Sequence, residues 1–330
     1  MRCLVTGATG AVGPRLVQAL SAAGHRVRML SRNQPGAGVL PEGVEVCCGD
    51  ITEPATVEAA MRDVEVAFHL AALLHIVNPP AALQARFERV NVGGTATVVQ
   101  AAVRAGLRRV VFFSTIAVYG DCADRIINED SPPHPQTCYA RTKLSAEQRV
   151  LRAVRSDGKA LGTVLRLGTV YGSRIKGNYR QLVHLLARGR FIPVGDGRNR
   201  RTLLYDRDVA SAAVLAMDHP SAAGQVYNVS DGQFHRLRDI IAVICDALGR
   251  RPPRFSLPLG PVRFAAGVLE GAARLLGQRS PIGRAMIDKY TEDVAVEGRR
   301  IQAELGFVPQ YNLATGWREA ILEMRQAGQL

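Results

Sequence analysis

The sequence predicts an α/β protein in which a doubly wound parallel sheet is followed by a smaller C-terminal α/β lobe. Short apolar runs alternate with helical patterns through the first half of the chain. The runs are rich in Val, Leu and Phe, which is typical of parallel strands buried on both faces. A glycine-rich turn joins the first run to the first helical pattern. Parallel strands linked by right-handed helical crossovers form a doubly wound sheet.

The elements of the main sheet are expected before residue 170. Apolar runs predict strands over residues 2–6, 26–31, 44–48, 64–70, 109–114 and 162–167. Amphipathic periodicity predicts helices over residues 14–23, 54–61, 81–105 and 139–156. We therefore assign residues 1–170 to the main domain.

The second half of the chain has a different composition. Glycine, arginine and proline become frequent, so residues 171–330 are expected to form mainly a substrate-binding lobe. Residues 202–217 have the pattern of a strand and a helix, and the segment 202–235 is expected to return to the main sheet. The stretch 262–276 is apolar with interspersed arginines. We expect a helix packed into the small lobe there, with a helix on a membrane surface as the alternative.

Composition and charge exclude several classes of protein. Of the 330 residues, 47% are hydrophobic and 22% are charged, which is typical of a globular chain rather than a disordered one. No apolar run reaches the ~18 residues of a membrane span, and the opening MRCLVTGATG leaves no room for a signal peptide. The net charge of +13 suits a polyanionic ligand. Because the basic residues are scattered and aromatic residues are only 5%, we expect phosphorylated metabolites rather than nucleic acid.

The cysteines and histidines indicate neither a metal site nor a disulfide framework. The six cysteines have no C-x-x-C spacing, and the seven histidines have no H-E-x-x-H spacing. We therefore expect no bound metal and a reducing, cytoplasmic location.

The glycine-rich turn TGATGAVG lies between the first strand and the first helix. Gly7 allows a tight turn, Gly10 allows the backbone to approach a pyrophosphate, and Gly13 allows the helix to pack closely on the strand. The helix N-terminus then offers free N–H groups and a positive dipole end to phosphates. This context predicts a dinucleotide cofactor, NAD(P), in a Rossmann-type domain.

The end of the second strand bears on the choice between NAD and NADP. An NAD site usually has an acidic residue there for the ribose 2′-hydroxyl, whereas this chain has Ser31 and Arg32. An arginine can pair with a 2′-phosphate, so the position favours NADP without excluding NAD. Asp50, after the third strand, has two alternatives: it accepts from the adenine amine, or it caps the helix near Pro54.

A candidate catalytic set follows from spacing on one helix and one strand. Tyr139 and Lys143 are four residues apart, so they share a helix face. A lysine ammonium beside a phenol favours the phenolate and is expected to lower its pKa from ~10. Ser114 and Thr115 end the strand that begins at Arg109, where a hydroxyl can bind a substrate oxygen.

With these residues in place, the chain resembles the extended short-chain dehydrogenase/reductase superfamily, in its NAD(P)-dependent nucleotide-sugar epimerase/dehydratase family, which includes UDP-glucose 4-epimerase. The resemblance covers residues 2 to about 232 and a short C-terminal motif. The matching motifs, in family order, are TGATGAVG (6–13), GDIT (49–52), FHLAAL (68–73), NVGGT (91–95), FFSTIAVYG (112–120), PQTCYARTK (135–143), RLGTVYG (166–172), GDGRNRRTLLYDRDVA (195–210), YNVSDG (227–232) and LGFVPQYNLATGWREAI (305–321).

The resemblance implies roles for particular residues. Tyr139 is implied as the acid/base, Lys143 as the group that holds the nicotinamide ribose, and Thr115 as the partner of the reacting hydroxyl, with Ser114 beside it. For the substrate, Arg201 is implied to hold a diphosphate and Asn178 to contact the nucleotide. A homodimer that pairs the helices over 81–105 and 139–156 is also implied. The expected cofactor-binding residues are Gly7, Thr9, Gly10, Ala11, Val12, Gly13, Ser31, Arg32, Asp50, Ile51, Leu70, Ala71, Ala72, Asn91, Tyr139 and Lys143.

Departures from the family pattern narrow the expected reaction. Ile116 and Ala117 stand where the family's dehydratases have Asp-Glu, and neither can transfer a proton. The family's second diphosphate-binding arginine has no clear counterpart, since Arg284 lacks the motif around it. The leading interpretation is a nucleotide-sugar 4-epimerase for a UDP-hexose, N-acetylhexosamine or uronate. The alternatives are an NADPH-dependent 4-ketoreductase of a nucleotide sugar, and a hydroxysteroid or flavonol-type dehydrogenase. The intact Tyr139, Lys143 and Thr115 argue against a catalytically silent regulator.

Overall fold

The computed structural model describes residues 1–36, 41–74, 80–122, 125–275 and 283–330. Its main feature is a seven-stranded sheet in the order β3-β2-β1-β4-β5-β6-β9, with every neighbouring pair parallel. The reversal of strand order beside β1 is the hallmark of a doubly wound sheet, so the expected fold class is confirmed. The strands are β1 (Arg2–Thr6), β2 (Arg26–Ser31), β3 (Glu45–Cys48), β4 (Val66–His69), β5 (Arg109–Thr115), β6 (Gly162–Leu167) and β9 (Val226–Val229).

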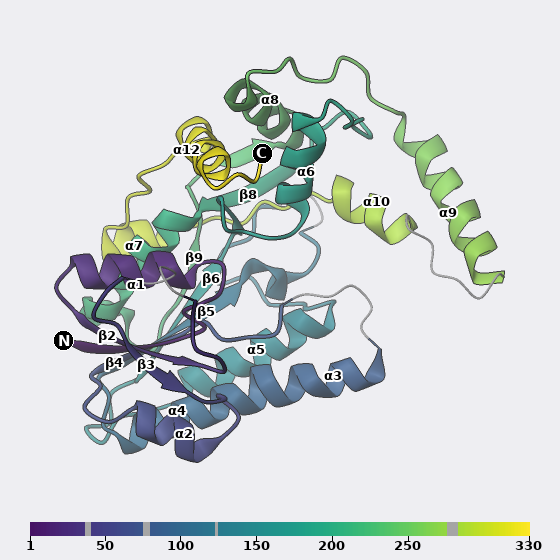
Figure 1. Cartoon of the computed structure of the whole chain (residues 1–330). Coiled ribbons are helices and arrows are strands. Elements are labelled where there is room, and N and C mark those ends of the chain that lie inside the picture. Colours follow the sequence, from purple (N-terminus) through teal and green to yellow (C-terminus); the bar gives the residue numbers. More distant parts are fainter. Residues whose placement is uncertain (37–40, 75–79, 123–124, 276–282) are drawn as a thin grey trace.

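Helices cover both faces of this sheet (Figure 1). On one face, α1 (Gly13–Ala22), α7 (Asp206–Asp218) and α11 (Arg299–Leu305) form an apolar core with the strands. On the other face, α2 (Pro54–Ala60), α4 (Gly94–Arg104) and α5 (Cys138–Leu151) form a second one. The sheet is therefore buried on both sides, which explains its nearly continuous apolar strands.

The long helix expected over 81–105 is divided in the structure. It consists of α3 (Ala81–Phe87), a π-helical turn over Glu88–Gly93, and α4. The π turn contains the buried Asn91, whose carbonyl accepts a 2.6 Å hydrogen bond from the Thr95 hydroxyl. Such turns occur frequently at functional sites. Helix α5 ends at Leu151, earlier than expected, because Val154 pairs with Ala160 in a bridge beyond it.

The second lobe is built on a three-stranded sheet in the order β10-β8-β7. Its strands are β7 (Thr169–Tyr171), β8 (Arg200–Tyr205) and β10 (Phe234–Arg236). Helices α6 (Asn178–Ala187), α8 (Leu237–Leu248) and α12 (Leu313–Gln326) pack on it around stacked rings of Tyr171 and Trp317, 4.5 Å apart. Of the segment 202–235, α7 and β9 belong to the main sheet layers, whereas β8 and β10 belong to the small sheet.

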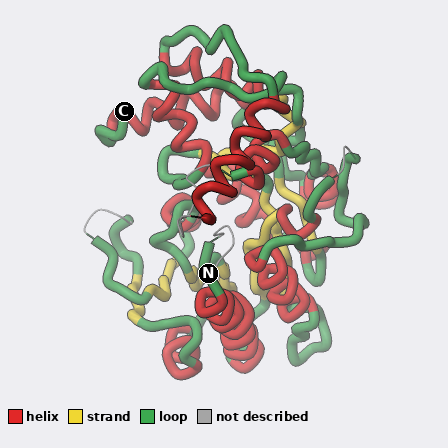
Figure 2. Tube along the Cα trace, turned by 90° about the vertical axis from the view of Figure 1, so that its right-hand side faces the viewer, coloured by secondary structure: helices red, strands yellow, loops and turns green. Residues whose placement is uncertain are grey.

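Two helices near the C-terminus lie outside the sheet layers, and the end of the second one contacts β8, where Arg201 donates to the Lys289 and Tyr290 carbonyls. Helix α9 (Leu259–Leu275) packs against α10 (Arg284–Thr291), and Figure 1 shows the pair at the edge of the molecule. Figure 2 views the molecule from that side. The expectation that this apolar stretch packs into the small lobe is wrong, because Phe264 of α9 is 70% exposed and Val268 is 55% exposed. Among the described residues, no helix has the length and hydropathy to cross a membrane.

Candidate active site

The glycine turn is tightly constrained by its neighbours. Gly7 has a φ of +74°, and a Cβ there would lie 2.7 Å from the backbone nitrogen of Ala71 at the end of β4. A Cβ on Gly13 would lie 2.3 Å from the carbonyl oxygen of Ala8. The N–H of Gly10 closes the turn onto the Gly7 carbonyl at 2.9 Å. Only glycine fits at positions 7 and 13 without backbone movement.

Helix α1 begins directly at this turn. Its N-cap residue, Val12, provides no side-chain hydrogen bond, and no acidic residue lies in the first turn. Thr9 and Gly10 are exposed, and Ala11 is half-buried. An uncapped helix N-terminus beside accessible backbone is a site for phosphate.

The residues expected around the rest of the dinucleotide differ in how accessible they are. Ser31 is half-buried at the end of β2, and Arg32 beside it is exposed. One carboxylate oxygen of Asp50 accepts from the Thr52 N–H and hydroxyl, each at 2.9 Å, so Asp50 stabilises the turn before α2. Ile51 is buried and packs against Gly94 of α4. A Cβ on Gly94 would lie only 2.6 Å from the Ile51 Cδ1 atom. Ile51 therefore has a clear packing role.

Asn91 positions the segment that follows β4, which includes Leu70, Ala71 and Ala72. Its side-chain oxygen accepts from the Leu73 N–H at 2.7 Å, and its amide nitrogen donates to the Leu73 carbonyl and to the Thr142 hydroxyl. Thr142 in turn donates to the Tyr139 carbonyl at 2.9 Å. The side chain of Asn91 thus connects the expected cofactor wall to the helix that carries Tyr139.

A buried histidine that the sequence analysis did not single out lies next to this network. His69 Nε2 is 2.9 Å from the Thr95 hydroxyl, and its Nδ1 is 2.7 Å from the Thr6 hydroxyl. Because the Thr95 proton goes to the Asn91 carbonyl, Nε2 must donate and Nδ1 must accept. Burial, with the charge of Lys143, lowers the pKa of His69 to about 3, so the ring is neutral. The sequence signal was a histidine at the end of a buried strand.

Tyr139 and Lys143 lie near the beginning of α5, which is capped by the Thr137 hydroxyl. Burial raises the pKa of Tyr139 to about 12. Lys143 is 2% exposed, and its Nζ lies 3.9 Å from the centre of the Phe112 ring. Burial lowers the pKa of Lys143 to about 7, against the opposing effect of Glu147. The expected lowering of the tyrosine pKa is therefore wrong for this structure, since burial dominates both groups.

The two hydroxyl residues at the end of β5 have different surroundings. The Thr115 Oγ1 accepts from the Ala117 N–H at 3.2 Å, at the start of the short turn Ile116–Tyr119 against which α5 packs. Ser114 is buried and donates its hydroxyl proton to Glu147. Adjacent strand residues point to opposite faces, so Ser114 does not join Thr115. The structure thus does not place the Ser114 hydroxyl in the expected catalytic set.

A buried ionic network lies beneath the tyrosine and lysine. Glu147 accepts three hydrogen bonds of 2.7–3.1 Å from the Arg166 guanidinium. Arg166 also donates to the Tyr119 hydroxyl at 2.9 Å, and Tyr119 donates to Asn228 at 2.8 Å. Glu147 was not among the residues expected from the sequence, although Tyr139, Lys143 and Glu147 repeat at a spacing of four on one helix face.

The two residues expected to contact the substrate, Arg201 on β8 and Asn178 at the start of α6, both belong to the second lobe. The Arg201 guanidinium donates to the carbonyls of Lys289 and Tyr290 at 2.9 and 2.7 Å. Burial raises the pKa of Tyr179 to about 12, and the nearby charge of Arg201 opposes that rise. Since Tyr179 follows Asn178 at the beginning of α6, Arg201 lies close to that helix end.

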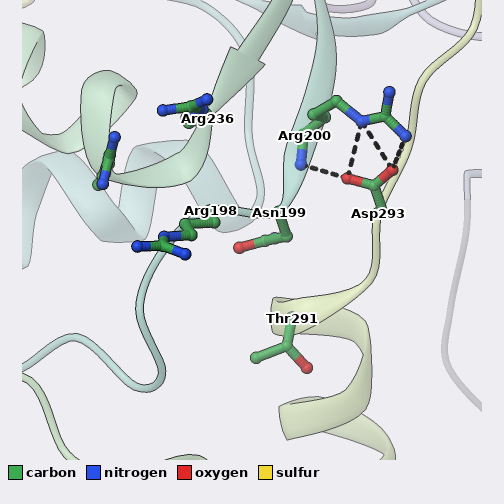
Figure 3. Close-up of a pocket in the computed structure, with 7 residues that line it drawn as sticks. Arg198, Asn199, Arg200, Arg236, Thr291 and Asp293 are labelled. Carbon is green, nitrogen blue, oxygen red and sulfur yellow. Dashed lines mark hydrogen bonds and ion pairs between the residues drawn. The ribbon is translucent and has the colours of Figure 1, made fainter. Parts of the chain in front are cut away.

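An arginine-rich cavity of about 650 Å³ adjoins β8 (Figure 3). Arg200 lines it and pairs with Asp293 at 2.6 and 2.9 Å. Tyr139, Lys143 and Thr115 do not line it. The lining residues are Arg198, Asn199, Arg200, Arg236, Arg238, Thr291 and Asp293.

Comparison with known proteins is decisive for the family. Residues 3–230 match the NAD dependent epimerase/dehydratase family. The chain belongs to this family. A ketoreductase of a farnesylated dihydroquinoline oxide from Stigmatella aurantiaca is 30% identical, with 99% of this chain and 97% of the relative covered. UDP-glucose 4-epimerase from Vibrio cholerae is 28% identical, with 98% and 95% covered.

Similar solved structures agree with the fold. MoeE5 in complex with UDP-glucose and NAD has a TM-score of 0.75 and 28% identity, with 99% of each chain covered. The structure of gox2253 has a TM-score of 0.82 and 26% identity, again with 99% of each chain covered. Members of the family are NAD(P)-dependent epimerases and oxidoreductases, and this chain is an enzyme of that kind.

The residues present fit such a cofactor. The turn at Gly7 and Gly13 leaves no space for side chains, and the uncapped end of α1 follows it. These features match the requirements of a bound pyrophosphate. A nicotinamide cofactor bound here would supply hydride transfer.

Proposed function

We propose that the chain is a nucleotide-sugar 4-epimerase that acts on a UDP-hexose, N-acetylhexosamine or uronate. The observation that carries the proposal is the surroundings of Thr115. Ile116 and Ala117 follow it, and the Ala117 N–H bonds back to the Thr115 hydroxyl oxygen. Neither residue can act as the second acid or base that loss of water across two carbons requires. The remaining chemistry is proton and hydride exchange at one carbon.

In the proposed mechanism, Thr115 orients the C4 hydroxyl and Tyr139 takes its proton. A nicotinamide cofactor held at the turn from Gly7 to Gly13 would supply removal of hydride from C4 and its return to the opposite face of the sugar. Tyr139 then returns the proton to the C4 oxygen. Because burial raises the pKa of Tyr139 to about 12, the phenol is protonated at neutral pH, which suits the proton-donating half of the reaction. The proton-accepting half requires cationic surroundings, and Lys143, four residues on, shares the helix face of Tyr139.

The proposed nucleotide site combines Arg201 and Asn178. The bonds from Arg201 to the two α10 carbonyls hold the guanidinium in place near the start of α6. Arginine suits a diphosphate because its planar fork can donate two parallel hydrogen bonds. Nucleotide-sugar recognition is further supported by the relative named UDP-glucose 4-epimerase and by MoeE5 bound to UDP-glucose.

A ketoreductase that uses external NADPH is the second candidate. Two observations favour it: Arg32 is exposed at the end of β2, and the Stigmatella aurantiaca ketoreductase is 30% identical over nearly the whole chain. The substrate in the name of that Stigmatella aurantiaca enzyme is not a sugar nucleotide. The same Tyr139 and Thr115 would serve this reaction, with proton donation to a ketone as the single chemical step.

One experiment separates the two candidates. The purified protein is denatured, released coenzymes are identified by mass spectrometry, and the native protein is incubated with UDP-glucose, UDP-N-acetylglucosamine and UDP-glucuronate. An epimerase carries NAD(P) and forms C4 epimers with no added coenzyme. Tyr139→Phe should reduce turnover by about 10²-fold or more, whereas Tyr311→Phe should leave it unchanged. A protein that converts no UDP-sugar, yet oxidises added NADPH with a ketone substrate, would overturn the epimerase proposal.

A further inference from the structure

Helix α9 presents an apolar face to solvent. Phe264 is 70% exposed, Val268 is 55% exposed and Leu269 is 54% exposed. Among the described side chains of this helix, residues 259–273, Arg263 is the one exposed charged group. The other exposed positions are Leu259, Gly260, Pro261, Phe264, Ala265, Val268, Leu269, Gly271 and Ala272. Surface helices of globular proteins normally turn such a face inward.

The two charged side chains among residues 259–273 of α9 interact with α10. Arg263 pairs with Asp288 of α10 at 2.7 Å. The carboxylate of Glu270 accepts from the Arg284 N–H at 3.3 Å. Because α10 occupies the charged side, the opposite side of α9 carries no charged side chain among residues 259–273. The exposed apolar face is thus a consequence of how the two helices pack.

The segment before α9 extends this surface and makes it basic. Phe255 is 85% exposed and Leu257 is also exposed. Arg250, Arg251 and Arg254 are exposed in the same segment. From residue 250 to residue 272 the sequence has four arginines and one acidic residue, Glu270, whose carboxylate is bonded to α10. Apolar and cationic groups are therefore combined in one continuous stretch.

We propose that residues 250–272 bind the surface of an anionic membrane. The apolar side chains of α9 and of Phe255 enter the boundary between headgroups and acyl chains, and the arginines contact lipid phosphates. Amphipathic helices with Phe and Leu on one side and cationic groups nearby bind membranes in this way. The helix has 17 residues, about 25 Å, so it lies on the membrane and does not cross it.

The charge of this surface favours an anionic membrane over a second copy of the chain as its binding partner. A two-fold interface brings the same patch of both copies together. Around α9 it would bring Arg250, Arg251 and Arg254 of both copies into one interface, where like charges repel, whereas an anionic lipid surface attracts all of them. The net charge of +13 acts in the same direction at long range. The proposal is independent of the reaction that the enzyme catalyses.

The test is co-sedimentation of the full-length protein with vesicles. Vesicles of phosphatidylcholine alone are compared with vesicles that contain equal parts of phosphatidylglycerol and phosphatidylcholine. We expect binding to the phosphatidylglycerol vesicles, at least tenfold weaker binding to phosphatidylcholine, and release as NaCl is raised.

Two multiple-substitution variants, each with a matched control, assign the binding to this surface. Phe264→Glu with Leu269→Glu should abolish co-sedimentation, because carboxylates on the apolar face oppose insertion. The matched control, Val308→Glu with Leu322→Glu, alters exposed side chains elsewhere on the molecule and should bind as wild type does. Circular dichroism and thermal melting check that both proteins are folded.

A triple variant, again with a matched control, tests the arginines. Replacing Arg250, Arg251 and Arg254 by Gln should weaken binding by about fivefold for each charge removed. The control replaces the exposed Arg26, Arg62 and Arg149 by Gln, with the same change in net charge. The two triple variants should differ by at least tenfold in vesicle affinity.

Three results would overturn the proposal. The first is no binding to phosphatidylglycerol vesicles at low salt. The second is binding that the Phe264→Glu, Leu269→Glu pair leaves intact. The third is a dimer in analytical ultracentrifugation that this pair converts to a monomer, which would make the surface an interface between copies.

Discussion

Glu147 lies one helical turn beyond Lys143 on α5, and its carboxylate raises the pKa of that buried ammonium while it accepts three hydrogen bonds from Arg166. The carboxylate is thus shared between a catalytic candidate and a structural arginine. Burial outweighs its effect on the lysine, whose pKa falls to about 7. A lysine that titrates near neutrality makes the charge state of this site sensitive to pH.

Glu147→Gln is expected to change the pH dependence of the enzyme. Loss of the carboxylate lowers the pKa of Lys143 further, so the lysine loses its proton at lower pH. If turnover requires the charged lysine, the alkaline limb of the pH–rate profile should move down by about one unit or more. The variant also leaves the buried Arg166 without its carboxylate partner, which should cost about 3–5 kcal/mol of stability.

Glu129→Gln is the control for that measurement. Glu129 is a buried carboxylate that accepts from the Asn228 N–H at 2.8 Å, and it is not among the charges that shift Lys143. It should lose stability without moving the alkaline limb. A folded Glu147→Gln protein with an unchanged limb would contradict the assigned role of Glu147.

Lys143→Met is expected to stabilise the fold while it reduces activity. The unfolded chain keeps Lys143 charged up to the ordinary lysine pKa of 10.5, whereas the folded chain releases the proton above about 7. Wild-type stability should therefore rise as pH increases from about 7 to 10.5. Below pH 7 the buried charge is fully present, and the methionine variant should be more stable by about 2–4 kcal/mol.

Urea unfolding at pH 6 and pH 9 checks this expectation. The stability difference between Lys143→Met and wild type should be large at pH 6 and smaller at pH 9. Lys159→Met, which removes a charge that is 75% exposed, should show no such difference. Equal stability of Lys143→Met and wild type at pH 6 would show that the buried ammonium is not destabilising.

Local patterns predicted the parts of the site that depend on neighbouring residues. The turn from Gly7 to Gly13 and the shared face of Tyr139 and Lys143 follow from spacing along the chain. The partners of Ser114 and Arg201 do not, because Glu147 and the Tyr290 carbonyl come from elements distant in sequence. Even so, strand alternation alone would have placed Ser114 and Thr115 on opposite faces.

The position of α9 shows a second limit. Its apolar periodicity correctly predicted a helix, but periodicity does not identify the surface that covers the apolar face. That depends on α10, which takes the charged side through Asp288. Likewise, the π turn at Asn91 depends on hydrogen bonds to Leu73 and Thr142, which no helical pattern contains.

Gly13→Ala is expected to damage both the fold and cofactor binding. The new Cβ would lie 2.3 Å from the Ala8 carbonyl oxygen, so backbone must move at the point where α1 meets the turn. We expect a loss of about 2–4 kcal/mol in stability and at least tenfold weaker NAD binding, measured by thermal melting and by fluorescence titration.

Gly271→Ala on α9 is the matched control, because a Cβ there meets nothing within 4 Å. It should leave stability and NAD affinity unchanged or raise stability slightly, since alanine favours helix. If Gly13→Ala behaved in the same way, the tight packing of the turn would not be a requirement of the site.

Arg32→Gln is expected to separate the affinities for NADP and NAD. Arg32 is exposed at the end of β2, where a 2′-phosphate of the proposed cofactor would lie. Removing its charge should weaken NADP binding about tenfold, since a charge-assisted hydrogen bond is lost, and should leave NAD binding unchanged.

The control is Arg26→Gln. Arg26 is an exposed arginine at the opposite end of the same strand, so its replacement should affect neither affinity. The four dissociation constants are measured by fluorescence titration at fixed ionic strength. An equal loss for both coenzymes would assign Arg32 to general electrostatic attraction, and no loss for either would remove it from the site.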